Sequence, residues 1–210
     1  DSEHNKKPVE PVEPAKLLRA ADVSSYQPRD LTEIIQFYSL DLLVVRLYLP
    51  WEAPPQEHSI QQIESVRANG KKVGAYLWGY RSSDPRRSVR EAIALAVSCN
   101  VQLPILWLDV EPSPEGDELP DATWIRAAID EGQNQGVRIG IYTGAWVWPM
   151  LGNTTEFGDM GVPLWAAQHF GGPTLDDFKP FGGWTKAVGK QYLVDKTLLP
   201  NGVDLDVFWA

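Results

Sequence analysis

Two carboxylic acids stand one residue apart at the end of an apolar run in ILWLDVEPS, residues 105–113. The run before Asp109 is typical of a buried strand, and side chains two residues apart on a strand share a face. We therefore expect Asp109 and Glu111 to point the same way. Neighbouring negative charge raises the pKa of one acid, so that it keeps a proton while its partner stays charged. These are the two roles that cleavage of a glycosidic bond requires.

Further acids stand on the first and the last of the expected strands. Asp22 lies in AADVSSYQ, and Asp204 and Asp206 lie in VDLDVF. Ligands of parallel α/β folds bind at the carboxyl ends of the strands, which makes acids at such places candidates for function. The same acids could hold Ca²⁺ or Mg²⁺ through oxygen ligands. They come from separate strands with no contiguous loop signature, so we favour the glycosidase and predict no metal site.

The composition indicates a globular domain and argues against a nucleic-acid partner. Of 210 residues, 43% are apolar and 22% are charged, which is ordinary for a chain with a packed core. The formal net charge of -9 leaves little basic surface for phosphate groups. No stretch reaches the roughly 18 apolar residues of a transmembrane helix, so we predict no membrane span.

Expected strands and helices alternate along most of the chain. Strands are expected over residues 17–24, 41–49, 72–79, 103–111, 137–143, 162–169, 187–194 and 203–208, and helices over residues 30–39, 59–70, from 85 onward, 121–135 and 145–151. Repeated strand–helix units predict a parallel sheet. Eight strands in a chain of this length predict a small TIM-like α/β barrel without its last helices. An open doubly wound sheet is the alternative, but the Gly-rich phosphate fingerprint that favours it is absent.

The start of the chain differs from the rest. Residues 1–16 are polar and contain the repeat Pro-Val-Glu-Pro-Val-Glu-Pro, which is typical of an extended linker. We therefore expect a linker over residues 1–16 and a barrel over residues 17–210. A linker at this place implies a further domain upstream of it.

Seven short motifs occur along the chain, and their order is more specific than any one of them alone. They are DVSSYQ (22–27), GAYLW (74–78), ILWLDVE (105–111), GIYTG (140–144), LWAAQH (164–169), KQY (190–192) and VDLDVF (203–208). In this order, over roughly residues 19 to 209, the chain resembles glycoside hydrolase family 25. These are the Chalaropsis-type lysozymes, N-acetylmuramidases of bacteria, fungi and phages.

The resemblance implies an activity and roles for four acids. It implies a barrel of about five βα units followed by strands with few helices, and hydrolysis of peptidoglycan glycan strands without a cofactor. The bond cleaved would be the β-1,4 bond between N-acetylmuramic acid and N-acetylglucosamine. Glu111 matches the general acid/base. Asp109 matches the partner that attacks the anomeric carbon or orients the acetamido group of the substrate, and Asp22 and Asp204 match two supporting aspartates.

The resemblance also gives roles to residues around the acids. The candidates for substrate binding are Tyr76, Trp78, Tyr142, Trp165, Gln191, Tyr192 and Arg46. Because side chains alternate along strands, about half of the aromatic residues are expected to face the core or the helices instead. Three positions depart from the family pattern: Arg46 with Leu47 in the second strand, Trp78 where Phe is typical, and Asp206 where Asn is usual.

Three functions follow, and the first leads. It is a muramidase, extracellular and secreted or phage-associated, that acts on bacterial peptidoglycan. The second is a catalytically silent barrel that binds wall glycan, which would not need to keep a protonatable pair of acids. The third is a glycosidase for another amino-sugar polymer, which the altered second strand favours. The acidic net charge disfavours attraction to anionic walls, so we expect wall binding to rely on the domain before the linker.

Overall fold

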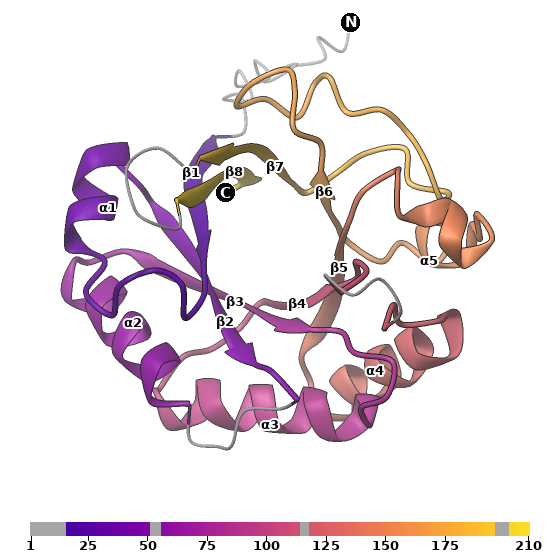
Figure 1. The fold of residues 1–210 in the computed structure, drawn as a ribbon, viewed down its shortest axis with the longest axis horizontal. Helices are drawn as coiled ribbons and strands as arrows, with labels where there is room; N and C mark the ends of the chain where they lie inside the picture. Colours follow the sequence, from indigo (N-terminus) through magenta and orange to yellow (C-terminus); the bar gives the residue numbers. More distant parts are fainter. Residues whose placement is uncertain (1–15, 51–55, 114–117, 196–201) are drawn as a thin grey trace, which may run out of the picture.

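The computed structural model describes residues 16–50, 56–113, 118–195 and 202–210 (Figure 1). The predicted linker over residues 1–16, except for Lys16, lies outside the described residues. The strands are β1 (Leu17–Val23), β2 (Leu42–Tyr48), β3 (Lys72–Trp78), β4 (Ile105–Asp109), β5 (Arg138–Thr143), β6 (Leu164–Ala167), β7 (Gly189–Asp195) and β8 (Val203–Trp209). The helices are α1 (Thr32–Tyr38), α2 (Glu57–Ala68), α3 (Pro85–Ser98), α4 (Ala122–Asn134) and α5 (Glu156–Asp159), with the 3-10 helix η1 (Trp148–Leu151).

The strands close into one barrel, and helices α1 to α4 pack around its outside (Figure 1). Each strand from β1 to β6 runs parallel to the next one. The predicted TIM-like α/β barrel is therefore confirmed. The expected loss of helices is confirmed as well, since helices of two turns or more follow β1 to β4 and only η1 and the one-turn α5 follow β5.

Strand β8 corrects the prediction of a parallel sheet, because it runs antiparallel to both β7 and β1. Only seven residues, 196–202, separate the ends of β7 and β8. A parallel connection needs a crossover of about a dozen residues or more, so this short connection permits only antiparallel pairing. The reversal has a consequence for the acids. Asp204, near the start of β8, lies opposite Asp22, near the end of β1.

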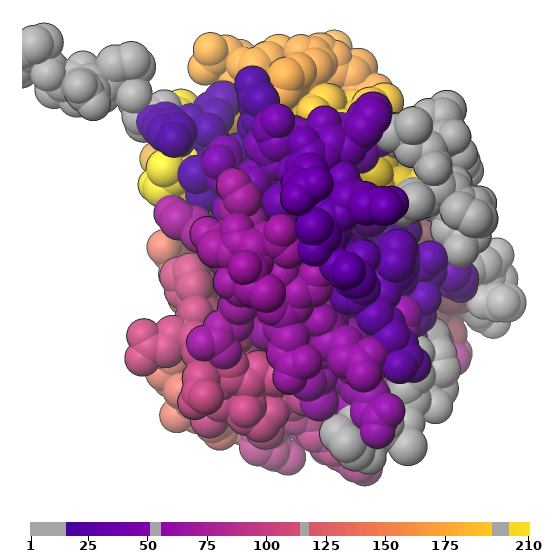
Figure 2. All heavy atoms as spheres, turned by 90° about the vertical axis from the view of Figure 1, so that its left-hand side faces the viewer, coloured from indigo at the N-terminus to yellow at the C-terminus, as the bar shows by residue number. Residues whose placement is uncertain are grey.

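Two apolar layers hold the barrel together. The outer layer lies between strands and helices and includes Leu43, Val89 and Ile125, which solvent does not reach. The N-terminal half of the chain covers it along one flank (Figure 2). The inner layer fills the barrel and consists largely of rings: Ala20, Val44, Tyr76, Trp107, Tyr142, Trp165 and Phe208. Neighbouring residues of a strand face opposite layers, which explains why β2 (LLVVRLY) is apolar almost throughout.

Aspartates begin the two longest helices, and an ion-pair network joins them. Asp84 Oδ1 accepts from two backbone N–H groups in the first turn of α3, and Asp121 Oδ1 accepts from one in α4. These caps satisfy donors that have no partner inside the helix. Glu131 of α4 pairs with Arg86 (3.7 Å) and Arg90 (3.3 Å) of α3. The two helices therefore cover neighbouring strands as one layer.

A long loop over residues 168–188 replaces a helix between β6 and β7. Lys190 of β7 is fully buried, and its Nζ donates to both carboxylate oxygens of Asp177 (2.8 and 3.0 Å). Gln168 Nε2 donates to the backbone oxygen of Asp177 (3.1 Å). A charge-assisted hydrogen bond to a buried ammonium group is stronger than a neutral one, so Lys190 fixes this loop against the barrel.

Two glycines make room for the rings inside the barrel. A Cβ atom at Gly140 would lie 2.5 Å from ring carbons of Trp107, and a Cβ atom at Gly189 would overlap the ring of Phe208. Both glycines lie on strands next to the strand that carries the ring. Each large ring inside the barrel therefore occupies the space that a side chain at the glycine of the neighbouring strand would need.

Gly140→Ala should destabilise the protein by about 1–3 kcal/mol, because the added methyl group displaces the ring of Trp107 from a packed interior. Gly74→Ala on β3 is the matched control, since a Cβ atom there would lie 3.4 Å from its nearest neighbours. Urea unfolding followed by tryptophan fluorescence measures both changes. Equal losses of stability in the two variants would contradict this packing account.

Candidate active site

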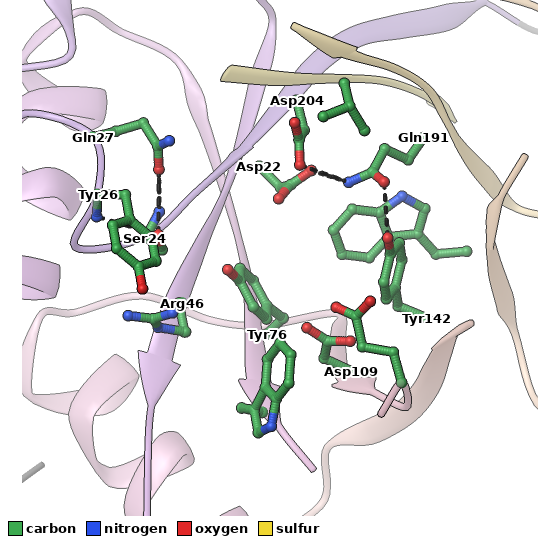
Figure 3. Close-up of a pocket in the computed structure, with 14 residues that line it drawn as sticks. Asp22, Ser24, Tyr26, Gln27, Arg46, Tyr76, Asp109, Tyr142, Gln191 and Asp204 are labelled. Atoms are coloured by element: carbon green, nitrogen blue, oxygen red, sulfur yellow. Dashed lines mark hydrogen bonds between the residues drawn. The ribbon is translucent and has the colours of Figure 1, made fainter. Parts of the chain in front are cut away.

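A cavity of about 270 Å³ opens at the end of the barrel where the parallel strands have their carboxyl termini (Figure 3). Its lining residues are Asp22, Ser24, Tyr26, Gln27, Arg46, Tyr76, Trp78, Asp109, Glu111, Tyr142, Trp165, Gln191, Val194 and Asp204. The structure thus brings the four predicted catalytic acids to one cavity. It also brings there all of the predicted substrate-binding residues except Tyr192.

Tyr192 packs on the outside of the barrel, against the outer layer. Side chains alternate along β7, and it is the neighbouring Gln191 that faces the cavity. We expected about half of the predicted aromatic residues to face away from the cavity. Of those five residues, Tyr192 alone does so. Tyr76 and Trp78 are two residues apart on β3 and therefore share the inner face.

The backbone at the end of β4 is fixed on both sides, which aims the acid pair. Gly79 N donates to Asp109 O (2.9 Å), and Val110 N donates to Tyr142 O (2.9 Å). The side chain of Val110 is fully buried in the outer layer. Asp109 and Glu111, on either side of it, both line the cavity. The expectation that these two acids share a face is therefore confirmed.

Burial and proximity raise the pKa of both members of this pair. Desolvation, then the charge of Glu111 and a hydrogen bond to it, raise the pKa of Asp109 well above its usual value. Desolvation also raises the pKa of Glu111, whereas the hydrogen bond that Glu111 accepts from Asp109 lowers it. The pair therefore holds one proton between two carboxyl groups and titrates as a unit.

Gln191 joins the two remaining acids. Its Nε2 donates to Asp22 Oδ2 at 2.7 Å and to Asp204 Oδ2 at 3.4 Å (Figure 3). Desolvation and then the charge of Asp204 raise the pKa of Asp22 well above its usual value, and the hydrogen bond from Gln191 lowers it in part. The amide thus reduces the repulsion between two carboxyl groups that strand pairing places side by side.

The oxygen of the same amide accepts from two further residues. Tyr142 OH donates to Gln191 Oε1 at 2.8 Å, and His169 Nε2 lies 2.7 Å from it. An amide oxygen only accepts, so this imidazole nitrogen carries a proton. Sequence reasoning missed His169, which reaches the site from the loop after β6, and it missed Val194. The position of His169 just after a strand was the available signal.

Arg46 and the loop after β1 form the other side of the cavity (Figure 3). Arg46 is 9% exposed, and its Nη2 donates to Ser25 Oγ at 2.9 Å. Among the described residues that line the cavity, it is the one cation. Ser24, Tyr26 and Gln27 also line it and were not predicted. Their place directly after the carboxyl end of a strand could have identified them.

Gln191 donates to two of the cavity acids, Asp22 and Asp204. Within the described ranges, no group of three or more His, Cys, Asp or Glu side chains is arranged to hold a metal ion. In the same part of the chain, no helix combines the length and the apolarity needed to cross a membrane.

Known proteins share sequence with this chain. The model of the family described as lysozyme-like protein 1 matches residues 13–192. Probable GH family 25 lysozyme 4 of Dictyostelium discoideum is 38% identical over 95 residues, which cover 44% of this chain and 44% of that protein. Counting factor 50 of the same organism is 30% identical over 126 residues, which cover 58% of this chain and 41% of that protein. The chain thus spans less than half the length of these two relatives.

A solved structure shares the fold. It is the modular autolysin LytC from Streptococcus pneumoniae in complex with a synthetic peptidoglycan ligand. The TM-score is 0.70 at 18% sequence identity, and the superposition covers 92% of this chain and 47% of that one. At this identity the likeness concerns the barrel alone.

Asp109→Asn should stabilise the protein at neutral pH. An acid whose pKa is raised on folding weakens the fold as the pH rises past its unfolded value of about 3.9, because the unfolded chain then loses the proton first. Burial raises the pKa of Asp109 in this way. The gain should be close to zero near pH 4 and should increase as the pH rises towards 7, because the unfolded chain loses this proton over that range while the folded protein keeps it.

Unfolding free energies of wild type and variant at the two pH values measure this gain. Asp176→Asn, at an exposed position of the loop between β6 and β7, is the control for the loss of a negative charge. A gain of the same size at both pH values, or an equal gain in the control, would show that Asp109 does not titrate as described.

Proposed function

The chain belongs to the lysozyme-like family within glycoside hydrolase family 25, and on this premise we propose that it hydrolyses bacterial peptidoglycan. The proposed target is the β-1,4 bond between N-acetylmuramic acid and N-acetylglucosamine. One observation carries the proposal: Asp109 and Glu111 form a hydrogen-bonded carboxyl pair in a cavity that also contains Asp22 and Asp204. The family membership agrees with the resemblance found in the seven sequence motifs.

Glu111 is the proposed general acid. It is partly exposed, whereas Asp109 is 5% exposed, so a glycosidic oxygen can approach Glu111 from the cavity. In the free protein the two carboxyl groups share one proton, because burial raises the pKa of both. Positive charge that develops at the anomeric carbon stabilises the Asp109 anion, and the proton passes through Glu111 to the leaving oxygen. Glu111 then accepts a proton from the water that completes hydrolysis.

Asp109 is the proposed partner that stabilises the oxocarbenium-like centre. Enzymes that invert configuration keep their two carboxyl groups about 6.5–9.5 Å apart, which leaves room for the attacking water. A hydrogen-bonded pair leaves no such room. Asp109 therefore attacks the anomeric carbon itself or orients the acetamido group that attacks it. Both routes retain the anomeric configuration.

Asp22 and Asp204 support the reaction through their charge. Negative groups fixed before the reaction stabilise positive charge as it forms, without the cost of reorienting water. Gln191 holds both carboxyl groups in place by donating to each. Tyr142 and His169 hold Gln191 in turn, because both donate to its oxygen.

The sugar rings are proposed to bind along the aromatic wall of the cavity. The ring centroids of Tyr142 and Trp165 are 4.6 Å apart, and those of Tyr76 and Trp165 are 6.2 Å apart. These three rings are at most 8% exposed and form the floor of the cavity. The partly exposed Trp78 and the 69% exposed Tyr26, which also line the cavity, offer aromatic faces that can stack on the apolar faces of sugars. Arg46, on the opposite side, offers a planar set of donors for a carbonyl or carboxylate of the glycan.

The similar proteins support the substrate class. LytC holds a peptidoglycan ligand in its solved structure, and one curated relative is named as a probable lysozyme. Peptidoglycan lies outside the bacterial cytoplasmic membrane. We therefore propose an extracellular or phage-associated site of action.

Glu111→Gln should lower the rate of peptidoglycan hydrolysis by about 10²–10⁴-fold, because the amide cannot donate a proton to the leaving oxygen. The measurement is the release of new reducing ends from purified peptidoglycan, with identification of the sugar at each end. We expect N-acetylmuramic acid at the ends released by wild type. Glu64→Gln, an exposed change of the same kind on α2, should keep the wild-type rate.

Three outcomes would contradict the proposal. Reducing-end N-acetylglucosamine would mean that a different bond is cleaved. Activity on a polymer of N-acetylglucosamine but not on peptidoglycan would indicate a related glycosidase. Wild type that binds peptidoglycan and releases no reducing ends would indicate a glycan-binding module.

A further inference from the structure

Asp206 is a carboxyl group inside the barrel, beneath the cavity. It is 1% exposed, and its Oδ1 accepts a hydrogen bond from Trp165 Nε1 at 2.9 Å. No N–H or hydroxyl group of the described residues donates to its Oδ2. Strand β1 pairs with β8 so that Ala20 lies opposite Asp206 and Asp22 lies opposite Asp204, which makes Asp22 and Asp206 diagonal neighbours on one face of the sheet. Asp206 Oδ2 is therefore the oxygen available for a hydrogen bond with the carboxyl group of Asp22. Two carboxyl groups form a hydrogen bond only when one of them is protonated.

The surroundings decide which of the two keeps the proton. Asp22 lines the cavity and is partly exposed, whereas Asp206 is 1% exposed, so a negative charge is better solvated on Asp22. Gln191 Nε2, at 2.7 Å from Asp22 Oδ2, stabilises that charge further. Burial, followed by the charge of Asp22, raises the pKa of Asp206 well above its usual value. For Asp22 the same hydrogen bond lowers the pKa, although burial has the larger effect and raises it. The deeper burial of Asp206 therefore assigns the proton to Asp206 rather than to Asp22.

The titratable groups that face Asp206 offer no positive charge to stabilise its anion. Asp22 comes from β1 and Asp204 from β8 itself, and both disfavour its ionisation. The phenols of Tyr142 on β5 and Tyr192 on β7 are also near enough for its charge to raise their pKa, after burial. Within the described part of the chain, no Lys or Arg forms an ion pair with Asp206.

We propose that Asp206 is a positioning residue, which keeps its proton in the folded protein and donates it to Asp22. The carboxylate of Asp22 is then held from two sides, by Gln191 and by Asp206, and is aimed at the cavity. The proposal rests on the proposed function only in so far as Asp22 serves the reaction. The location of the proton does not depend on it.

A pH dependence follows from this arrangement. While Asp206 is protonated, Asp22 keeps both donors and its charge. When Asp206 loses its proton at high pH, its buried anion lies next to the anion of Asp22, and Asp22 loses its second donor. Catalytic support from Asp22 should therefore fail on the alkaline side of the pH profile.

Two variants separate a proton donor from a group that only fills space. Asp206→Asn keeps a donor for Asp22 and an acceptor for Trp165, whereas Asp206→Leu has a similar volume and keeps neither. We expect kcat on peptidoglycan to be about tenfold lower for the Leu variant than for the Asn variant, as for the loss of one hydrogen bond to a charged group. KM should differ little between the two. The alkaline limb of kcat should move to higher pH in the Asn variant, because an amide has no proton to lose.

Two readouts need no substrate. The infrared difference spectrum between wild type and Asp206→Asn near pH 7 should contain the carbonyl band of a protonated carboxyl group. Asp206→Asn should also raise Tm near pH 7 and leave it unchanged near pH 4, because a buried acid with a raised pKa weakens the fold only above its unfolded pKa.

The outcomes separate this inference from the proposed function. If the carbonyl band is missing, or if Tm rises equally at both pH values, Asp206 is not protonated near pH 7 and the proposal is overturned. The band together with equal kcat values in the Asn and Leu variants would overturn the positioning role. A wild type without hydrolytic activity would refute the proposed function, and the infrared and Tm measurements would still decide where the proton lies.

Discussion

The arrangement of the cavity residues follows from one physical constraint. Several carboxyl groups, which repel each other when ionised, are buried close together inside a closed barrel. Asp22, Asp109, Glu111 and Asp206 all have a raised pKa, and burial is the first cause for each. Removing an ionised carboxylate from water costs several kcal/mol, so buried acids tend to keep protons instead. We propose that the acids form two pairs, Asp109 with Glu111 and Asp206 with Asp22, in each of which one proton is shared by two carboxyl groups. Each pair then keeps one negative charge, which the proposed hydrolysis uses.

The fold provides the conditions for this arrangement. The antiparallel β8 brings Asp204 and Asp206 beside the end of β1, and the aromatic interior shields them from water. Gln191 uses its donor and its acceptor to connect acids from two strands with Tyr142. Such a site lowers stability at neutral pH, since every raised pKa weakens the fold there.

Much of the architecture could be predicted from the sequence, for identifiable reasons. An apolar run that ends in Asp109 and Glu111 has few interpretations other than a buried strand that leads to a site. The direction of β8 was not predicted, although the short connection before it contained the information. His169 was missed because a long loop, fixed by Lys190 and Asp177, decides where its imidazole lies. The placement of protons depends on burial and on neighbours from several strands, which no local pattern encodes.

Neutron diffraction from a deuterium-exchanged crystal near neutral pH tests the central claim most directly, because it locates individual protons. The account predicts one deuteron between Asp109 and Glu111 and one between Asp206 and Asp22. In the second pair the deuteron should be bonded to Asp206. Nuclear density without a deuteron in either pair, with four ionised carboxylates in the cavity, would contradict the account.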